Sequence, residues 1–178
     1  GHMEKVILDV EHEAVGHGYF RLGTAEHSPN HRWLAWSSDT TGGEEFAVQI
    51  RDTARGHDLA DRIERTAGGV AWASDNETLF YVRLDENHRP ASVWRHRRGT
   101  DASGDVLVYE EPDPGFFVGV DRTLCGRFLA IHCHDHQTSE WRLVPADRPA
   151  EAPRLVAERV TAQEYTVAPH GSSLYVLT

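Results

Sequence analysis

A polar turn followed by an apolar run recurs four times along this chain. The runs share an equivalent leucine, which falls at Leu34, Leu79, Leu129 and Leu174. The spacings are 79−34 = 45, 129−79 = 50 and 174−129 = 45 residues. A period near 45 residues, with β-forming side chains in every copy, is typical of β-sheet repeats that stack or radiate. We therefore predict an all-β fold in which each repeat supplies one small antiparallel sheet.

Turn residues divide each repeat into short strands. In the second repeat, strands are predicted over residues 69–73, 78–83, 92–96 and 105–109. In the third, they are predicted over 116–120, 128–132, 140–144 and 154–157. The first repeat gives strands over 33–37 and 46–51 and a fourth strand within 58–66, and residues 5–9 are expected to form an outer strand of a preceding blade. The pattern predicts a partial β-propeller of about three four-stranded blades plus part of a fourth.

Length sets the domain organisation. Four-stranded blades close a ring with roughly four to eight copies, so the 178 residues of this chain form an incomplete ring. Residues 1–3, Gly-His-Met, are interpreted as an expression scar, and residues 4–178 as one partial propeller domain. No apolar run approaches the roughly 18 residues of a membrane span, so no membrane partner is expected.

Charge and cysteine usage limit the partners. The net charge of −10, from 28 acidic and 18 basic residues, disfavours nucleic acid and mildly favours cationic partners. Plain solubility explains the same surplus of acid. Cys125 and Cys133 lie eight residues apart without a zinc or disulfide pattern, which favours a reducing, cytoplasmic location. No cofactor is expected.

Catalytic motifs are missing from the sequence. The chain has no Gly-x-Ser-x-Gly elbow and no glycine loop that would cradle a phosphate, so no catalytic residue is predicted. The five tryptophans recur once or twice per repeat at strand positions, which favours packing between blades over ligand stacking.

Three histidines offer a candidate metal site. His132, His134 and His136 alternate along the chain and would share one face of an extended strand, where imidazoles can hold zinc or copper. Solvent-facing histidines explain the same pattern. The repeat register is expected to carry His132 out of the second strand of its blade into a loop.

Longer segments carry a family resemblance. They include Leu34-Ala35-Trp36-Ser37, the run from Leu79 to Asp101, and Asp105 to Glu111. With these segments the chain resembles the propeller of the prolyl oligopeptidase family, and within it the oligopeptidase B (protease II) branch.

The resemblance implies a seven-bladed propeller over a C-terminal α/β-hydrolase domain that bears a serine peptidase triad. That domain would be the partner of this chain, and the propeller would act as a lid that admits only short peptides, cleaved after Lys or Arg. The fragment would be inactive alone and, with unpaired blade edges, would self-associate. Five residues are candidates for the substrate tunnel or the interdomain surface: Arg83, Asp85, Glu86, Glu110 and Glu111.

The competing hypothesis is a stand-alone β-repeat binding module. In that case the chain would work without a hydrolase domain, and the three histidines would link it to a metal. Acidic loops gathered around a pore would attract short basic peptides, and a solvated rim explains the same loops.

Overall fold

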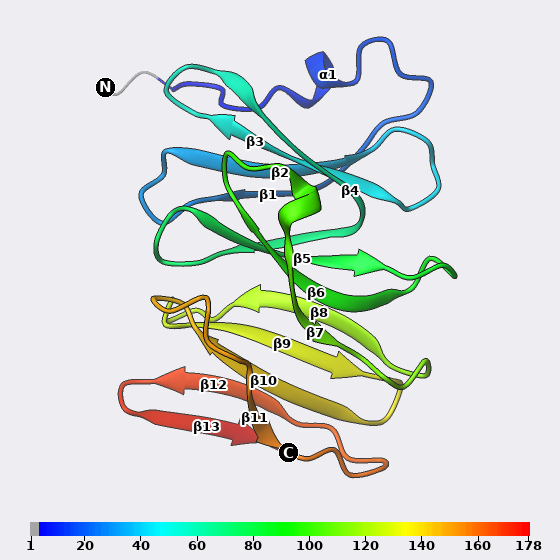
Figure 1. Ribbon diagram of the computed structural model, residues 1–178, viewed down its shortest axis with the longest axis vertical. Helices are drawn as coiled ribbons and strands as arrows, with labels where there is room; N and C mark the ends of the chain where they lie inside the picture. The colour runs from blue at the N-terminus through cyan, green and yellow to red at the C-terminus, as the bar shows by residue number, and fades with distance from the viewer. Residues whose placement is uncertain (1–3) are drawn as a thin grey trace.

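The computed structural model describes residues 4–178 as antiparallel sheets stacked one beside the next (Figure 1). The proposed expression scar, residues 1–3, lies outside the described residues. The elements are α1 (Val10–Glu13), β1 (Arg21–His27), β2 (Trp33–Asp39), β3 (Phe46–Asp52), β4 (His57–Trp72), β5 (Thr78–Leu84), β6 (Pro90–Arg97), the 3-10 helix η1 (Ala102–Gly104), β7 (Val106–Glu110), β8 (Phe117–Arg122), β9 (Phe128–His134), β10 (Ser139–Pro145), β11 (Arg154–Ala157), β12 (Thr166–His170) and β13 (Ser173–Leu177).

The first two blades share one strand. Strands β1 to β7 pair in sequence order, each antiparallel to the next, because the 16-residue β4 belongs to both blades. Its first part pairs with β3 as the outer strand of blade 1, and its last part pairs with β5 as the first strand of blade 2. The register shifts between Thr66 and Val70, where Gly68 adopts a φ of +92° that favours glycine.

The third blade is a separate four-stranded sheet in the order β11-β10-β9-β8. It is followed by a two-stranded sheet of β12 and β13, which supplies the first strands of a fourth repeat and lies at the bottom of Figure 1. The four equivalent leucines fall in β2, β5, β9 and β13, so the repeat found in the sequence is the repeat of the fold. The prediction of three antiparallel blades and part of a fourth is confirmed.

Two hydrophobic cores lie between the blades. Ile63 of blade 1 packs with Leu79 and Tyr81 of blade 2, whereas Phe80 and Val82 on the other face of β5 pack against blade 3. A strand between two blades is buried on both faces, which is why β5 reads as a continuous apolar run and not as an alternation. Trp72 joins the first core directly and Trp33 and Trp94 pack against it, as predicted, whereas Trp36 and Trp141 belong to neither core.

Three details of the strand prediction are wrong. Residues 5–9 form no strand; Asp9 instead caps the short helix α1 by accepting from the backbone N–H of Glu11 and His12. The sequence analysis also missed β1, whose polar residues hide its pairing with β2. Finally, the separate strands expected within 58–66 and over 69–73 are one continuous strand, β4.

Candidate functional site

One edge of the stack is built from three equivalent turns. Each turn follows the second strand of a blade and begins with an aspartate, Asp39, Asp85 or Asp135. The Asp85 carboxylate accepts from the backbone N–H of Asn87 at 2.8 Å and of Arg89 at 2.9 Å, and the other two aspartates hold their turns in the same way. We call this side, on the right of Figure 1, the Asp-turn edge. Its aspartates form turns, as Asx residues commonly do.

The five predicted tunnel or interdomain residues all lie at this edge on blade 2. Arg83 is near the end of β5, Asp85 and Glu86 are in the next turn, and Glu110 and Glu111 end β7 and follow it. The register places them across neighbouring strands, since Ser92 of β6 faces both Arg83 and Glu110. Only Glu86 and Glu110 of the five are exposed, and the other three are held by neighbouring groups.

Glu111 is a buried carboxylate in an ion pair. Arg159, from the connection between β11 and β12, contacts it at 2.8 Å, and the Tyr109 hydroxyl donates to it at 2.8 Å. Burial alone would raise the pKa of Glu111, but the guanidinium and these hydrogen bonds hold the pKa below its usual value. Glu111 is therefore a charged structural group in this fold.

Glu140 and Arg142 of β10 complete that cluster, and the sequence analysis missed both of them. Glu140 of β10 contacts Arg159 at 3.3 Å and Arg142 at 2.7 Å. The cluster therefore joins blade 2, blade 3 and the segment that leads to β12. Arg159 lies 48 residues from Glu111 in the sequence, so only the fold brings them together.

A second buried network joins blades 1 and 2. The ring of His96 in β6 lies between two carboxylates, with Nε2 at 2.9 Å from Asp61 of β4 and Nδ1 at 2.7 Å from Asp105. Burial opposes the charged ring, but the two carboxylates raise the pKa of His96 to about 9. The ring is 0% exposed. It cannot reach a solute, so this group acts on the packing of the blades and not on a substrate.

Arg83 is the predicted edge residue near the end of β5. Its guanidinium lies over the Trp94 ring, 4.3 Å from the ring centroid, and donates to the Tyr81 hydroxyl at 2.9 Å. That hydroxyl donates in turn to Asp105 at 2.9 Å. Arg83 is thus positioned by the same network that holds His96.

The three candidate metal ligands do not come together. His132 and His134 lie on one face of β9, with stacked rings 5.5 Å apart, while His136 is exposed in the next turn. The expectation that His132 leaves the strand is wrong, because β9 continues to His134. Gly119 allows this arrangement, since a Cβ there would collide with the His132 ring. Within residues 4–178, no group of three His, Cys, Asp or Glu side chains is placed to hold a metal ion.

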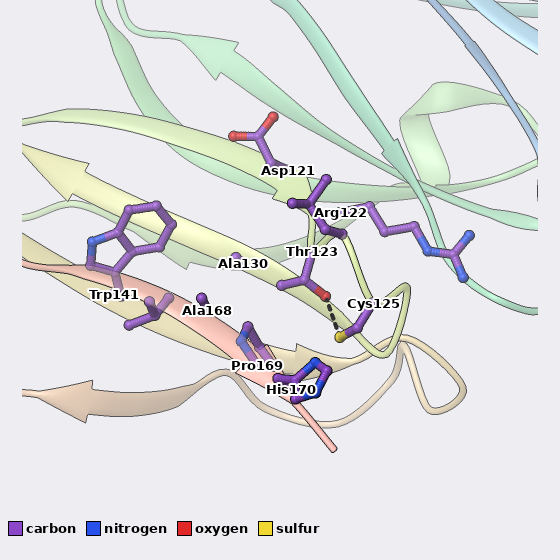
Figure 2. Close-up of a pocket in the computed structure, with 11 residues that line it drawn as sticks. Asp121, Arg122, Thr123, Cys125, Ala130, Trp141, Ala168, Pro169 and His170 are labelled. Atoms are coloured by element: carbon purple, nitrogen blue, oxygen red, sulfur yellow. Dashed lines mark hydrogen bonds between the residues drawn. The ribbon is translucent and has the colours of Figure 1, made fainter. Parts of the chain in front are cut away.

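Two hollows lie between blade 3 and the β12–β13 sheet. The first, about 540 Å³, lies between the β8–β9 turn and β12, as Figure 2 shows. The second, about 500 Å³, lies on the other side of Trp141, beside His132 and His134. Both mark a face of blade 3 that the two-stranded sheet covers only in part.

The cysteines are free thiols in different surroundings. Cys125 is exposed at the first hollow, where a hydrogen bond with the Thr123 hydroxyl at 3.5 Å and the nearby Arg127 lower its pKa (Figure 2). Cys133 is buried on β9, and burial raises its pKa to about 12. No helix among the described residues is long and apolar enough to cross a membrane.

Comparison with known proteins identifies the family to which this fold belongs. The N-terminal β-propeller domain of prolyl oligopeptidase matches residues 1–178. The chain belongs to this family. Among curated relatives, it is 29% identical to Protease 2 of Moraxella lacunata over 98% of the chain and 26% of the relative. It is 35% identical to dipeptidyl aminopeptidase BI of Pseudoxanthomonas mexicana over 82% of the chain and 20% of the relative.

Solved structures of the oligopeptidase B branch share the fold. Oligopeptidase B from Leishmania major superposes with a TM-score of 0.90 at 30% identity, covering 97% of this chain and 24% of that one. The Trypanosoma brucei oligopeptidase B gives a TM-score of 0.90 at 32% identity, covering 99% and 25%. The resemblance seen in the sequence is confirmed. The chain spans about a quarter of the length of the oligopeptidase B structures.

Proposed function

We propose that this chain is the N-terminal propeller part of a longer, cytoplasmic serine oligopeptidase that cleaves short peptides after Lys or Arg. The observation that carries the proposal is the TM-score of 0.90 with oligopeptidase B over 99% of the chain. Catalysis would belong to a C-terminal α/β-hydrolase domain. The propeller would limit the size of the substrates, and residues 4–178 alone would be inactive.

The physical basis of the filter is steric. Blades whose shared faces are packed as buried cores form a rigid wall, because interiors at crystal-like density yield little. A wall of this kind over an active site excludes folded proteins, which raises selectivity without stabilising a transition state. In this chain, the rigid-wall argument is supported by the packed cores on both faces of blade 2.

Charge supports the preference for basic peptides. Glu86 and Glu110 are exposed carboxylates at the Asp-turn edge, and the chain carries a net charge of −10. Clustered negative charge raises the local concentration of cationic solutes and speeds their encounter, an effect that salt screens. Of the five residues predicted for this edge, these two are the exposed ones.

The test compares the isolated chain with the longer protein. We expect no hydrolysis of a fluorogenic peptide with Arg before the cleaved bond by the 178-residue chain, and inhibitor-sensitive hydrolysis by the longer protein. The longer protein should cleave a ten-residue peptide but not the same sequence placed within a folded domain. Turnover by the pure isolated chain, or equal cleavage of the folded domain, would contradict the proposal.

The charge effect is tested in the longer protein. Replacing Glu86 and Glu110 by Gln should raise KM for a dibasic peptide about two- to threefold at low salt and leave kcat unchanged. Glu77→Gln is the matched control, because Glu77 lies at the opposite edge and pairs with Arg97. An equal change in the control variant would show that position at the Asp-turn edge does not matter.

We also propose that the 178-residue chain self-associates through β13. Among the described residues β13 pairs only with β12, and Tyr175, Val176 and Leu177 are 60%, 47% and 74% exposed. An exposed apolar edge strand is a template for pairing with another chain. The occupant would be β13 of a second copy.

Light scattering of the isolated chain checks this. The wild-type chain should give a dimer mass, and Val176→Lys should shift it to monomer because the edge then carries a charge. Leu124→Lys, at a fully exposed position in the β8–β9 turn, is the control and should leave the dimer intact. A sharp monomer peak for the wild-type chain would sink this proposal.

A further inference from the structure

A basic groove lies between blade 1 and blade 2. It measures about 510 Å³ and runs between the outer part of β4 and the loop that carries η1. Arginine side chains from two strands line it, with the indole of Trp94 beside them. The lining residues used below are Arg62, Glu64, Arg65, Arg83, Trp94 and Ser103.

Arg83 is held in a fixed orientation in this groove. Its guanidinium is stacked 4.3 Å from the Trp94 ring centroid and donates to the Tyr81 hydroxyl at 2.9 Å. Trp94 is itself fixed, because its indole N–H donates to Ser92 Oγ at 2.9 Å. Stacking on an aromatic face leaves the N–H groups at the rim of the guanidinium available in one plane.

No carboxylate among residues 4–178 forms an ion pair with Arg83. The acidic group nearest to it through hydrogen bonds, Asp105, is reached only by way of the Tyr81 hydroxyl and already binds the His96 ring. A guanidinium carries five donors, and the only hydrogen bond of the Arg83 side chain to the described residues is the one to Tyr81. Arg83 therefore has unused donors beside the groove.

The two other arginines add positive charge. Arg62 contacts Glu64 at 2.5 Å and Gln49 at 2.6 Å, so it is largely satisfied. Arg65 is half exposed and reaches Glu45 only at 3.8 Å. The lining thus holds three arginines against Glu64 and the buried Asp105. Among the lining residues this is an excess of one positive charge, in a chain with a net charge of −10.

We propose that this groove binds an oxyanion, a phosphate or a carboxylate group, with Arg83 as the principal donor. Planar guanidinium groups donate two parallel hydrogen bonds to both anions, and such charge-assisted bonds are the strong ones. Arg65 would supply a second charge and the Ser103 hydroxyl a neutral donor, while Trp94 would pack against the carbon skeleton of the ligand. The site lies beside the outer strand of blade 1, and its principal donor, Arg83, also belongs to the Asp-turn edge.

The test uses pyrophosphate and citrate as probes of the 178-residue chain, with sodium chloride at matched ionic strength. Binding is followed by calorimetry and by the Arg83 Nε–Hε signal in NMR, assigned with Arg83→Lys. At least one probe should bind saturably, and Arg83→Gln should weaken it about tenfold or more. Binding of pyrophosphate alone identifies phosphate as the ligand group, and binding of citrate alone identifies carboxylate.

Two variants separate binding from folding. Arg65→Gln changes a half-exposed side chain and should weaken the probe about two- to threefold with no loss of thermal stability. Arg97→Gln, at an exposed arginine outside the groove, is the control and should bind as the wild-type chain does. The inference is overturned if neither probe saturates, or if Arg83→Gln and Arg65→Gln bind as tightly as Arg97→Gln.

Discussion

Leu79 and Leu174 occupy the same position in the repeat but opposite surroundings. Leu79 of β5 is 0% exposed between blades 1 and 2, and Leu129 of β9 is equally buried. Leu174 of β13 is 40% exposed. The local sequence around each leucine predicts a strand, and each forms one. The difference teaches that the local pattern decides the strand, whereas burial depends on a neighbouring blade.

The faces that meet differ in chemistry as well. The interfaces around blade 2 combine continuous apolar cores with a buried charged network. The face of blade 3 toward β12 presents His132, Asp121 and Trp141, and the hollows lie there. Because one chain contains both closed and open interfaces, the contribution of a neighbouring blade to the free energy of unfolding can be measured directly.

The largest expected difference is between Leu79→Ala and Leu174→Ala. Leu79→Ala removes a fully buried side chain between two blades and should lower the free energy of unfolding by about 4 kcal/mol. Leu174→Ala should cost about 0.5 kcal/mol, since much of that side chain is already in water. Urea denaturation of both variants measures the two values. Equal losses would mean that the β12–β13 sheet is as well packed as blade 2.

The pH dependence of stability probes the closed interface next. The pKa of His96 is raised to about 9 from an ordinary value of 6.5, so its stabilisation is complete below pH 6.5 and is lost as pH rises through 9. The loss should be about 3 kcal/mol. His96→Gln should flatten this part of the pH profile, whereas His170→Gln, at an exposed position on β12, should leave it in place. A wild-type stability that does not fall between pH 6.5 and 9 would contradict the charged state of this ring.

Arg159→Ala tests the tie between the closed and open regions. It leaves the Glu111 and Glu140 carboxylates buried without their shared cation, and because Arg159 is itself a quarter exposed we expect a loss of about 2 kcal/mol at pH 7. The loss should shrink as pH falls and Glu111, whose pKa Arg159 lowers, takes up a proton. Urea denaturation at pH 7 and pH 4 measures it. Arg154→Ala, at an exposed arginine, is the control, and an equal effect there would remove the special role of the cluster.

Much of the fold could be predicted because the repeat marks it. All four strands of blade 3 were located to within a few residues, since turn residues separate β-forming runs there. β1 was missed because its polar composition carries no β signal. The continuity of β4 was missed because the prediction left a break at residues 67–68, whereas the left-handed φ of Gly68 only shifts the register.

The position of the candidate site in the fold could be predicted from the sequence, but the contacts between its residues could not. The loop positions of Asp85, Glu86 and Glu110 follow from the repeat, so their common edge follows as well. The partners do not follow, because Glu111 meets Arg159, and His96 meets Asp61, through contacts 48 and 35 residues apart. No local pattern encodes such distant pairs.

The undivided strand β4 makes blades 1 and 2 one mechanical body. The backbone of β4 runs from one blade to the other without an intervening loop, although its pairing shifts register between Thr66 and Val70. Blades 2 and 3 are joined instead by the irregular segment 111–116. Blades 1 and 2 are therefore connected through a shared backbone strand, whereas blades 2 and 3 are held together by side-chain packing.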